Sequence, residues 1–571
     1  MLILQVVHNR VIANPNIPVV NVGNRENPSY LPAEVCVIMP GQNSNSKLDP
    51  NQTQQMIRFA VRKPWDNAGS ITMNGPRTVG LLPQDNATLS RFGVSIPPNL
   101  ITVPGRVLPT PSVRYKKEVQ ANVRFGSWNM ENYKLNSAAN LPRWSYLIIS
   151  MGGSNEYNMA SLQPTMAKFY KALQDVGITA AAPLRGKEAA INGPDDPTLE
   201  ANLKNPFGLL LVVLPRADRQ LYNRIKFIGD VKLGTHTICV VGSKFVKGSD
   251  QYNANVALKF NLKLGGINQL VHTTNLGIIN EEKTMVIGID VTHPSPGSAS
   301  NAPSVAAVVA SVDRWLGQWP ADLRIQESRK EMVTELDSMI ASRLSLWKTR
   351  GKHASLPENL LIYRDGVSEG QYDIVIDTEL PLIRKACADI YSATDTKKGF
   401  PKITIIIVGK RHHTRFYPTK EADADRSGNP KNGTCVDRGV TEPRNWDFFI
   451  QAHTAIQGTA RPAHYYIVLD EIFTKRKVAP PHQNAADVLE DLTHSMCYLF
   501  GRATKAVSIC PPAYYADIIC ERARCYLSGL FDMATPSATP AQSVVGEGVL
   551  GEPRAEDVLI HPNLRNTMFY I

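Results

Sequence analysis

The chain has 571 residues, of which 43% are hydrophobic, and its 62 Lys and Arg against 51 Asp and Glu give a formal net charge of +11. This length excludes a single small core and favours roughly two to four domains. The basic excess favours a polyanionic partner, with a basic protein that has no such partner as the alternative.

The apolar and cysteine patterns exclude further classes of protein. No apolar run approaches the roughly 18 residues of a membrane-spanning helix. The opening run Met1–Val7 is too short for a signal peptide and has no basic segment before it. The 8 cysteines are scattered without C-x-x-C spacing, which favours reduced thiols in the cytosol or nucleus and argues against structural zinc.

The first quarter of the chain lacks a clear domain pattern. Residues 1–35 begin abruptly and are interrupted by Asn and Pro, as in the tail of a domain. Residues 36–138 are rich in Pro, Asn and Gly and are predicted to be a long connector. Within them we expect a helix over Asp49–Val61, capped by Asp49, and short strands flanking Thr102–Leu108.

Residues 139–266 alternate between strand and helix patterns. The predicted strands are Trp144–Met151, Gly208–Leu214 and Thr237–Val241, and the predicted helices are Thr165–Val176, Leu221–Ile228 and Ala254–Leu264. This alternation predicts a small, doubly wound, Rossmann-like α/β domain.

Residues 267–571 form the largest predicted domain. We expect strands at Met285–Ile289, Val305–Ser311, Leu360–Tyr363, Ile403–Val408 and Tyr465–Leu469, and helices at Glu327–Leu346, Gln371–Ala388, Ala485–Tyr498 and Pro512–Leu527. The low-complexity stretch Ala534–Glu552 is predicted to be a disordered surface loop.

An acid interrupts the first strand of this domain. Asp290 follows the apolar run Met285–Ile289, and a second apolar run, Val305–Ala310, begins after a turn-rich break. Two such strands with an acid on the first are typical of a ribonuclease H-like sheet. A buried carboxylate is costly unless a metal, a cation or hydrogen bonds compensate. The alternative is that Asp290 only ends the strand.

Two more acids could stand opposite Asp290. Asp365 follows an apolar strand, where an acid faces the site crevice of an α/β sheet, and Asp517 falls in the second turn of a late helix. Carboxylates held together repel one another unless a divalent cation lies between them, and oxygen ligands suit Mg²⁺ or Mn²⁺. Two such ions about 4 Å apart can activate water for phosphodiester cleavage. Taken singly, Asp365 also fits an Asp-Gly turn, and Asp517 and Glu331 fit solvated helix acids.

Two groups of basic residues could bind phosphate. Lys259 and Lys263 share one helix face, as do Tyr222 and Lys226, so an anion pocket with a stacking ring is one reading and ordinary surface pairs the other. The stretch Lys410–Arg415 follows a predicted strand and suits backbone phosphates, with a solvated basic loop as the alternative.

Several stretches together closely resemble signatures of the Argonaute family. They are Ile289–Pro294 (IDVTHP), Tyr363–Gln371 (YRDGVSEGQ), Lys410–Arg415 (KRHHTR), His453–Thr459 (HTAIQGT), Arg461–His464 (RPAH) and Pro512–Ala516 (PAYYA). The resemblance covers nearly the whole chain and implies a PAZ remnant (1–35), the second linker (36–138), a Mid domain (139–266) and a ribonuclease H-like Piwi domain (267–571). The amino-terminal domain, the first linker and most of PAZ would be absent. Ala503–Pro512 and Asp517 look most like filamentous-fungal members, such as the Argonaute of the quelling pathway.

The resemblance also implies site residues. A catalytic tetrad falls on Asp290, Glu331, Asp365 and Asp517, of which the three aspartates would bind Mg²⁺ or Mn²⁺; animal members often have His in place of the last. The guide 5′ end would be bound by Tyr222, Lys226, Lys259, Lys263, Arg522 and the carboxylate of Ile571. Arg522 follows Asp517 by five residues, about 140° around the helix, so one helix could serve two sites on different faces. Guide and target backbones would contact Lys410, Arg411, His412, Arg415, Arg502 and Tyr514.

One position departs from the family pattern. Many members have Gln where this chain has Ile238, so His236, Thr237 or water would have to compensate in the phosphate pocket. The loop Pro215–Leu221 would touch the first guide base.

The implied function is a small-RNA-guided silencing effector that cleaves paired target or passenger RNA with Mg²⁺. Its partners would be a small guide RNA, the complementary RNA and silencing proteins, without a membrane, and the chain would be a monomer in the cytoplasm, with the nucleus as a second location. Because most of PAZ is missing, we expect weak or no cleavage by this lobe alone. The alternative is a guide-binding module that recruits partners without cutting. A DNA-guided nuclease is disfavoured because the resemblance is to eukaryotic members.

Overall fold

The structure is a computed structural model that describes residues 11–14, 16–23, 27–37, 39–41, 48, 50–82, 86–152, 157–204, 208–295, 298–531 and 552–571. The chain divides into two compact units. The first comprises Met1–Ala60 with Asp532–Gly551, and the second comprises Val61–Phe531 with Glu552–Ile571.

The described residues of the first unit form two short strands and two helices. Strand β1 (Val19–Asn21) pairs antiparallel with β2 (Tyr30–Pro32), and η1 (Ala33–Val35) follows. The helix expected near residue 50 is confirmed as α2 (Pro50–Ala60). Its expected cap, Asp49, and almost all of the predicted surface loop lie outside the described residues.

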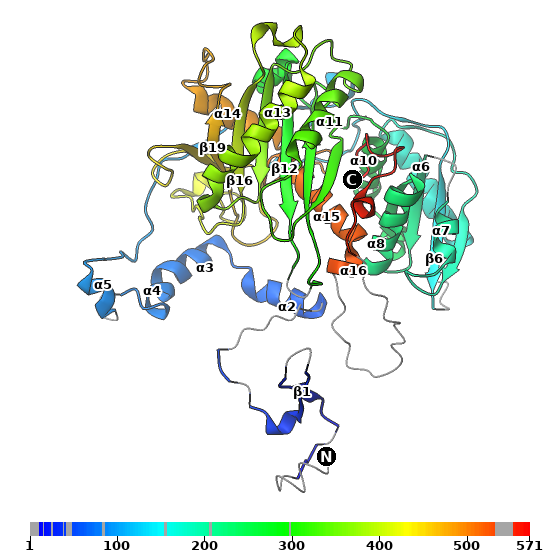
Figure 1. Ribbon diagram of the computed structural model, residues 1–571, viewed down its shortest axis with the longest axis horizontal. Coiled ribbons are helices and arrows are strands. Elements are labelled where there is room, and N and C mark those ends of the chain that lie inside the picture. Colours follow the sequence, from blue (N-terminus) through cyan, green and yellow to red (C-terminus); the bar gives the residue numbers. More distant parts are fainter. Residues whose placement is uncertain are drawn as a thin grey trace. The chain divides into compact units, whose positions relative to one another are not determined.

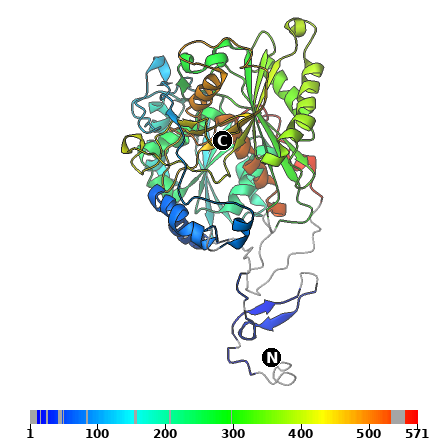
Figure 2. The same cartoon turned by 90° about the vertical axis from the view of Figure 1, so that its left-hand side faces the viewer.

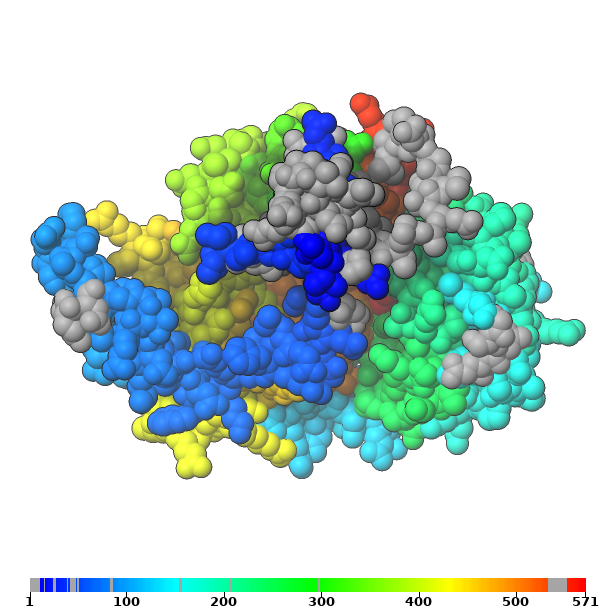
Figure 3. Space-filling view, turned by 90° about the horizontal axis from the view of Figure 1, so that it is seen from below, coloured from blue at the N-terminus to red at the C-terminus, as the bar shows by residue number. Residues whose placement is uncertain are grey.

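The rest of the predicted connector lies in the second unit. It begins with the short helices α3 (Pro64–Gly69), η2 (Ser70–Asn74), α4 (Gly75–Thr78) and α5 (Ala87–Arg91). They run along the loops of the large domain, in blue beside yellow in Figure 3, where Asn67 donates a hydrogen bond to the Tyr417 hydroxyl at 2.8 Å. The later part, β3 (Arg106–Val107), β4 (Val113–Arg114) and η4 (Lys116–Glu118), is more than a connector. Tyr115 and Trp128 are buried, and β3 is the edge strand of the large sheet.

The predicted doubly wound domain is confirmed around a four-stranded parallel sheet with the order β10-β9-β6-β8. Its strands are β6 (Ser145–Met151), β8 (Lys187–Ile191), β9 (Leu209–Leu214) and β10 (His236–Val241). On one face pack α6 (Met159–Asp175) and α10 (Asp250–Lys263), and on the other α7 (Thr198–Leu203) and α8 (Arg219–Phe227). Strand β8 was not predicted because Lys187 and Glu188 break its apolar pattern. The remaining elements are β5 (Asn140–Leu141), β7 (Thr179–Ala180), η5 (Ile228–Leu233) and α9 (Gly242–Val246).

The largest domain is built on a nine-stranded mixed sheet with the order β14-β13-β12-β15-β16-β19-β18-β17-β3. Its strands are β12 (Thr284–Thr292), β13 (Ser304–Ala310), β14 (Ala321–Gln326), β15 (Asn359–Asp365), β16 (Lys402–Gly409), β17 (Thr434–Val436), β18 (Trp446–Gln451) and β19 (Ala463–Asp470). Strands β12, β15 and β16 are parallel, and β13 runs antiparallel to β12. The five predicted strands are thus present within a larger ribonuclease H-like sheet.

Helices cover both faces of this sheet. The helices α11 (Leu336–Thr349) and α13 (Leu380–Ile390) pack on one face, and α15 (Pro511–Tyr526) crosses β12 and β13 on the other (Figures 1 and 2). The remaining helices are η6 (Thr273–Asn275), η7 (Gly277–Glu281), η8 (Glu369–Gln371), α12 (Tyr372–Ile374), η9 (Val375–Glu379), η10 (Asp395–Lys398), η11 (Glu421–Asp423), α14 (Ala485–Met496), α16 (Ser528–Phe531) and η12 (Ala555–Val558), and β11 (Leu270–Val271) pairs with β4.

One predicted boundary is wrong and bears on the site. The helix expected over Glu327–Leu346 begins at Leu336, because β14 extends to Gln326 and residues 327–335 form the turn after it. Glu331 therefore lies on a loop, and its side chain is only 12% exposed. Among the described residues, no helix combines the length and apolar character needed to cross a bilayer.

Candidate active site and neighbouring cationic cavity

Two of the predicted acids lie side by side on adjacent strands. In the parallel pair β12–β15, Ile289 is in register with Arg364, so Asp290 and Asp365 are the next residues on each strand. Asp290 is 8% exposed and lies within β12, which continues to Thr292, so it does not merely end the strand. The backbone N–H of Gly366 donates to Asp365 Oδ1 at 2.8 Å.

A third acid reaches the pair from α15. Burial, and then the charge of Asp517, raise the pKa of Asp290 to about 7. Burial, Asp290 and Asp517 together raise the pKa of Asp365 well above its usual value. Burial and Glu521 also raise the pKa of Asp517, against the lowering effect of Arg411 and Lys410. The structure thus brings the three predicted aspartates together as a mutually repelling set.

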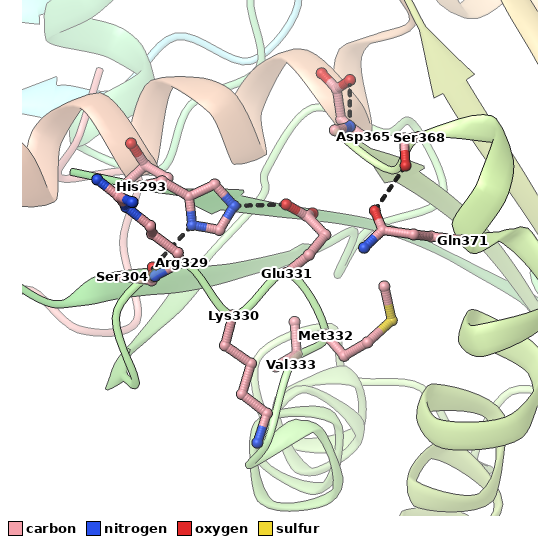
Figure 4. A network of polar contacts seen from close by, with 12 residues as sticks. His293, Ser304, Arg329, Lys330, Glu331, Met332, Val333, Asp365, Ser368 and Gln371 are labelled. Carbon is pink, nitrogen blue, oxygen red and sulfur yellow. Dashed lines mark hydrogen bonds and ion pairs between the residues drawn. The ribbon is translucent and has the colours of Figure 1, made fainter. Parts of the chain in front are cut away.

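Glu331 joins this group from the loop before α11, held on two sides. His293 Nε2 lies 2.6 Å from Glu331 Oε2 (Figure 4). Arg364 Nη1 lies 3.0 Å from Glu331 Oε1. Arg364 is fully buried and also pairs with Glu379 at 3.1 Å. A Cβ on Gly366 would lie 3.2 Å from Asp290 Oδ1 and 3.4 Å from Glu331 Oε1, so two carboxylates of the set converge on this glycine.

The residues that support Glu331 were not assigned roles from the sequence. His293 and Arg364 both belong to motifs that carry the family resemblance, and that membership was the available signal. Their partners Ser304 and Glu379 come from distant parts of the chain and carry no local signal. His293 Nδ1 lies 2.8 Å from Ser304 Oγ.

The donors of this site suit a hard divalent cation. No group of three or more His, Cys, Asp or Glu side chains is arranged ready to hold a metal ion in the described parts of the chain. The raised pKa values of Asp290 and Asp365 nevertheless mean that Arg364 compensates these buried carboxylates only in part. A cation bound between their oxygens would supply the remaining positive charge, and oxygen ligands favour Mg²⁺ or Mn²⁺. The residues present therefore fit the predicted ion.

Beside the acids, a cavity of about 580 Å³ opens against α8, α10 and α15. The predicted residues that line it are Tyr222, Lys226, Ile238, Lys259, Arg502, Tyr514, Asp517, Arg522 and Ile571. Burial, and then Arg502 and Lys226, lower the pKa of Lys259 to about 8. This lysine is held among other cations, an arrangement that favours an anionic ligand.

The other predicted lysines are already engaged. Lys226 donates to the Thr237 carbonyl at 2.7 Å and to Thr237 Oγ1 at 2.9 Å, and its ammonium lies 5.3 Å from the centre of the Tyr222 ring. Lys263 is buried, donates to the carbonyl of Phe569 and does not line the cavity. Lys263 thus holds the C-terminal segment rather than facing the cavity.

Arg522 also supports the C-terminal segment. It donates to buried Asp230 at 2.6 Å and to the Tyr570 carbonyl at 2.9 Å. Asp517 and Arg522 both line the cavity, and Asp517 also lies close enough to Asp365 to raise its pKa, so α15 contributes to both sites.

Neither of the two residues expected to compensate for Ile238, His236 and Thr237, lines the cavity. Ile238 lines the cavity and is 3% exposed, while His236 and Thr237 are buried and do not line it. Thr237 is also occupied by Lys226. Lys259 and Arg502 are therefore better placed than either neighbour to replace the missing polar group.

The predicted backbone-contacting residues divide into two groups. Arg502 and Tyr514 line the cavity, and Tyr514 stacks on Phe500 at 4.5 Å. In the loop after β16, Lys410 donates to Ser508, His412 Nε2 lies 2.9 Å from the Pro462 carbonyl, and Arg415 donates to the carbonyls of His412 and Thr414. Arg411 is exposed, which leaves it the most accessible cation of this loop.

Comparison with known proteins decides the family. The Piwi domain model matches residues 209–528, more than half of the chain, and the Argonaute linker 2 model matches residues 66–115. The chain belongs to the Argonaute family. The Piwi match begins at β9, inside the stretch expected to be the Mid domain, and the linker match lies inside the expected second linker.

Relatives of this Argonaute chain extend over nearly all of it. Protein argonaute 5 of Arabidopsis thaliana is 32% identical over 97% of this chain and 55% of that protein. Protein argonaute 18 of Oryza sativa subsp. japonica is 34% identical over 91% of this chain and 47% of that protein. The chain thus spans about half the length of these curated relatives.

Solved structures share the fold of this Argonaute chain. Kluyveromyces polysporus Argonaute, crystallised with a guide RNA, matches with a TM-score of 0.77 at 26% identity. The match covers 100% of this chain and 64% of the Kluyveromyces chain. The MID-PIWI domains of the Neurospora crassa QDE-2 Argonaute have a TM-score of 0.54 at 32% identity, over 77% of this chain and 100% of theirs. These likenesses support the Rossmann-like and ribonuclease H-like parts of the fold.

Proposed function

We propose that this chain anchors the 5′ end of a small guide RNA and cleaves the RNA paired with it. The observation that carries the proposal is the position of α15. This helix places Asp517 close to Asp290 and Asp365, and its side chains also line the cationic cavity. A ligand end fixed in the cavity would therefore lie at a set distance from the acids, as a cut at one defined position requires.

The cavity suits a 5′-phosphorylated RNA end. Lys259 and Arg502 offer charge, and Tyr222 offers a ring on which the first base could stack, an interaction worth about 1–3 kcal/mol. Lys226, Lys263, Arg522 and the Ile571 carboxylate complete the proposed binding set, the first three partly by holding the wall and the C-terminal segment in place. The relative crystallised with a guide RNA supports RNA as the guide.

The acids suit hydrolysis of a phosphodiester. Asp290, Asp365 and Asp517 would hold Mg²⁺, which when bound supplies an activated water and neutralises charge on the leaving oxygen. Glu331, held in place by His293 and Arg364, would orient a water molecule or the metal ligands. The products would carry 3′-hydroxyl and 5′-phosphate ends. Arg411 and Tyr514 would hold RNA backbone without reading sequence, because base pairing supplies the specificity.

Two finer features belong to the same proposal. The likeness to the Neurospora crassa domains over their full length favours a filamentous-fungal, quelling-type member. We expect the chain to act as a monomer in the cytoplasm, also in the nucleus, with silencing proteins as further partners.

Guide binding tests the first half of the proposal. We would measure the affinity of the full-length protein for one guide RNA carrying a 5′-phosphate or a 5′-hydroxyl, and for the same sequence as DNA. The proposal predicts tighter binding of the phosphorylated RNA by at least about tenfold, as one charge-assisted contact provides. Equal affinity for both ends would contradict a phosphate pocket, and tighter binding of the DNA would favour a DNA-guided protein.

A second function is a guide-binding module that recruits partners without cutting. Lys259 and Arg502 line the cavity and would hold a guide 5′ end in either case. Silencing by Asp290→Ala in cells separates the two, because it removes a carboxylate of the acid set and leaves the cavity intact. Silencing that survives the substitution would favour the module.

A further inference from the structure

Arg524 fastens the loop after β12 to helix α15. It follows Asp517 by seven residues, close to two helical turns, so both lie on one side of the helix. Its guanidinium donates to the His293 carbonyl at 3.0 Å and to Ser295 Oγ at 2.8 Å, and lies 4.6 Å from the centre of the Phe531 ring. This three-sided hold fixes the backbone that carries His293.

The fixed loop determines how His293 faces Glu331. Ser304 Oγ accepts the Arg329 N–H at 2.8 Å and lies 2.8 Å from His293 Nδ1, so the imidazole is held on this side as well. A neutral imidazole that accepts at Nδ1 carries its proton on Nε2. That proton points to Glu331 Oε2 at 2.6 Å (Figure 4). A shift of the loop would therefore break the contact that orients Glu331.

Arg524 also borders the cationic cavity. It lines the cavity together with Tyr222 and Lys259. A phosphate bound there would lie near the guanidinium that holds the loop. A link between the two sites requires that this phosphate interact more favourably with the loop-bound arrangement than with a released one.

We propose that Arg524 is a positioning residue that links the RNA end in the cavity to the placement of Glu331. The inference rests on the proposed function and adds a connection between its two sites. Arginine suits this role because its planar fork contacts two acceptors at once, which a lysine cannot reproduce.

A kinetic comparison tests the link in full-length protein. Arg524→Ala is expected to lower single-turnover cleavage at saturating guide by at least about tenfold, while guide affinity falls by a clearly smaller factor. Arg524→Lys should restore little of the rate. The double variant with His293→Ala should cut no more slowly than His293→Ala alone, because both substitutions release the same contact. Additive losses, or a loss of guide affinity equal to the loss of rate, would overturn the proposal.

Hydrogen exchange gives a readout that does not need cleavage. In wild-type protein, a 5′-phosphorylated guide should slow amide exchange over residues 329–333 more than a 5′-hydroxyl guide, and Arg524→Ala should remove the difference. Arg384→Ala, which removes an exposed guanidinium paired with Glu471 at 3.1 Å, is the matched control and should keep it. Protection that persists in Arg524→Ala would overturn the link even if the protein binds and cuts RNA. No guide binding by wild type would overturn the proposed function and the link together.

Discussion

The Cα of Gly288 faces the carbonyl oxygen of Pro512 so closely that a Cβ added there would overlap it. Gly288 lies on β12 two residues before Asp290, and Pro512 lies in the first turn of α15, the helix that carries Asp517. This approach of strand and helix sets how far Asp517 stands from the other two acids.

Gly288→Ala is therefore expected to push α15 away from the sheet. Overpacking of this kind costs about 1–3 kcal/mol of unfolding free energy, and cleavage should fall further than stability because Asp517 moves. Denaturant unfolding and cleavage assays measure the two effects. Gly529→Ala is the control, since its Cβ would meet nothing within 4 Å, and it should leave both unchanged. Normal cleavage by Gly288→Ala would show that the spacing is not critical.

The aspartates predict a pH-dependent stability in metal-free protein. The pKa of Asp290 is raised to about 7 and that of Asp365 well above its usual value, whereas unfolded Asp titrates near about 3.9. A raised pKa stabilises the folded state while the group is protonated, so this contribution is full below about pH 4 and is lost as pH rises through about 7.

Unfolding in EDTA at pH 5 and pH 8 measures this loss. The Asp290→Asn, Asp365→Asn double variant should show a smaller decline, and adding Mg²⁺ to wild type should offset it at pH 8, because a bound cation favours the ionised carboxylates. An equal decline in the double variant would assign the pH dependence to other groups.

The lowered pKa of Lys259 leads us to expect that guide affinity depends on pH. Its pKa is lowered to about 8 by burial and neighbouring cations, so in the free protein it loses its charge progressively as pH rises from about 7 to about 9. Affinity for a 5′-phosphorylated guide should then fall between pH 7 and pH 9, while Lys259→Arg should remain level. A 5′-hydroxyl guide serves as the control, and an equal fall for both guides would remove Lys259 from the phosphate contact.

The ion pairs of Arg106 lead us to expect a second pH dependence of stability, at the opposite edge of the large sheet from β14. It joins edge strand β3 to α14 through Glu490 and through Asp487 at 2.7 Å. Burial raises the pKa of Glu490 to about 7 against the lowering effect of Arg106.

Arg106→Ala should cost about 1–3 kcal/mol of unfolding free energy, since Glu490 loses its partner. The cost should be larger at pH 8 than at pH 5, where Glu490 can take up a proton. Arg438→Ala, which removes an exposed arginine near Asp437, is the comparison. A cost that does not change with pH would mean that Glu490 does not titrate between pH 5 and pH 8.

The sequence could predict those site residues whose position follows from local pattern. Asp290 and Asp365 each follow an apolar run, and parallel strands bring such positions to one edge of a sheet. Asp517 required the family resemblance, because an acid in a helix turn carries no signal of what it faces. Tyr222 and Lys226 were correctly placed on one helix face, as their 5.3 Å contact shows.

The sequence could not predict contacts that depend on packing between distant segments. Glu331 was placed on a helix because its charged neighbours hide the end of β14. Lys263 and Arg522 meet the carbonyls of Phe569 and Tyr570 only after the C-terminal segment folds back. Strand β3 joins the large sheet from more than 300 residues away in the chain, beyond the range of any local pattern.

The most direct test of the account is cleavage of a labelled target RNA by full-length protein loaded with a 5′-phosphorylated guide in Mg²⁺, comparing wild type with Asp517→Ala. We predict a single cut by wild type and a rate at least about a thousandfold lower in the variant, as when a member of a catalytic set is removed. Equal cutting by both would remove Asp517 from the site, and no cutting by wild type would contradict the proposed nuclease and leave the guide-binding module.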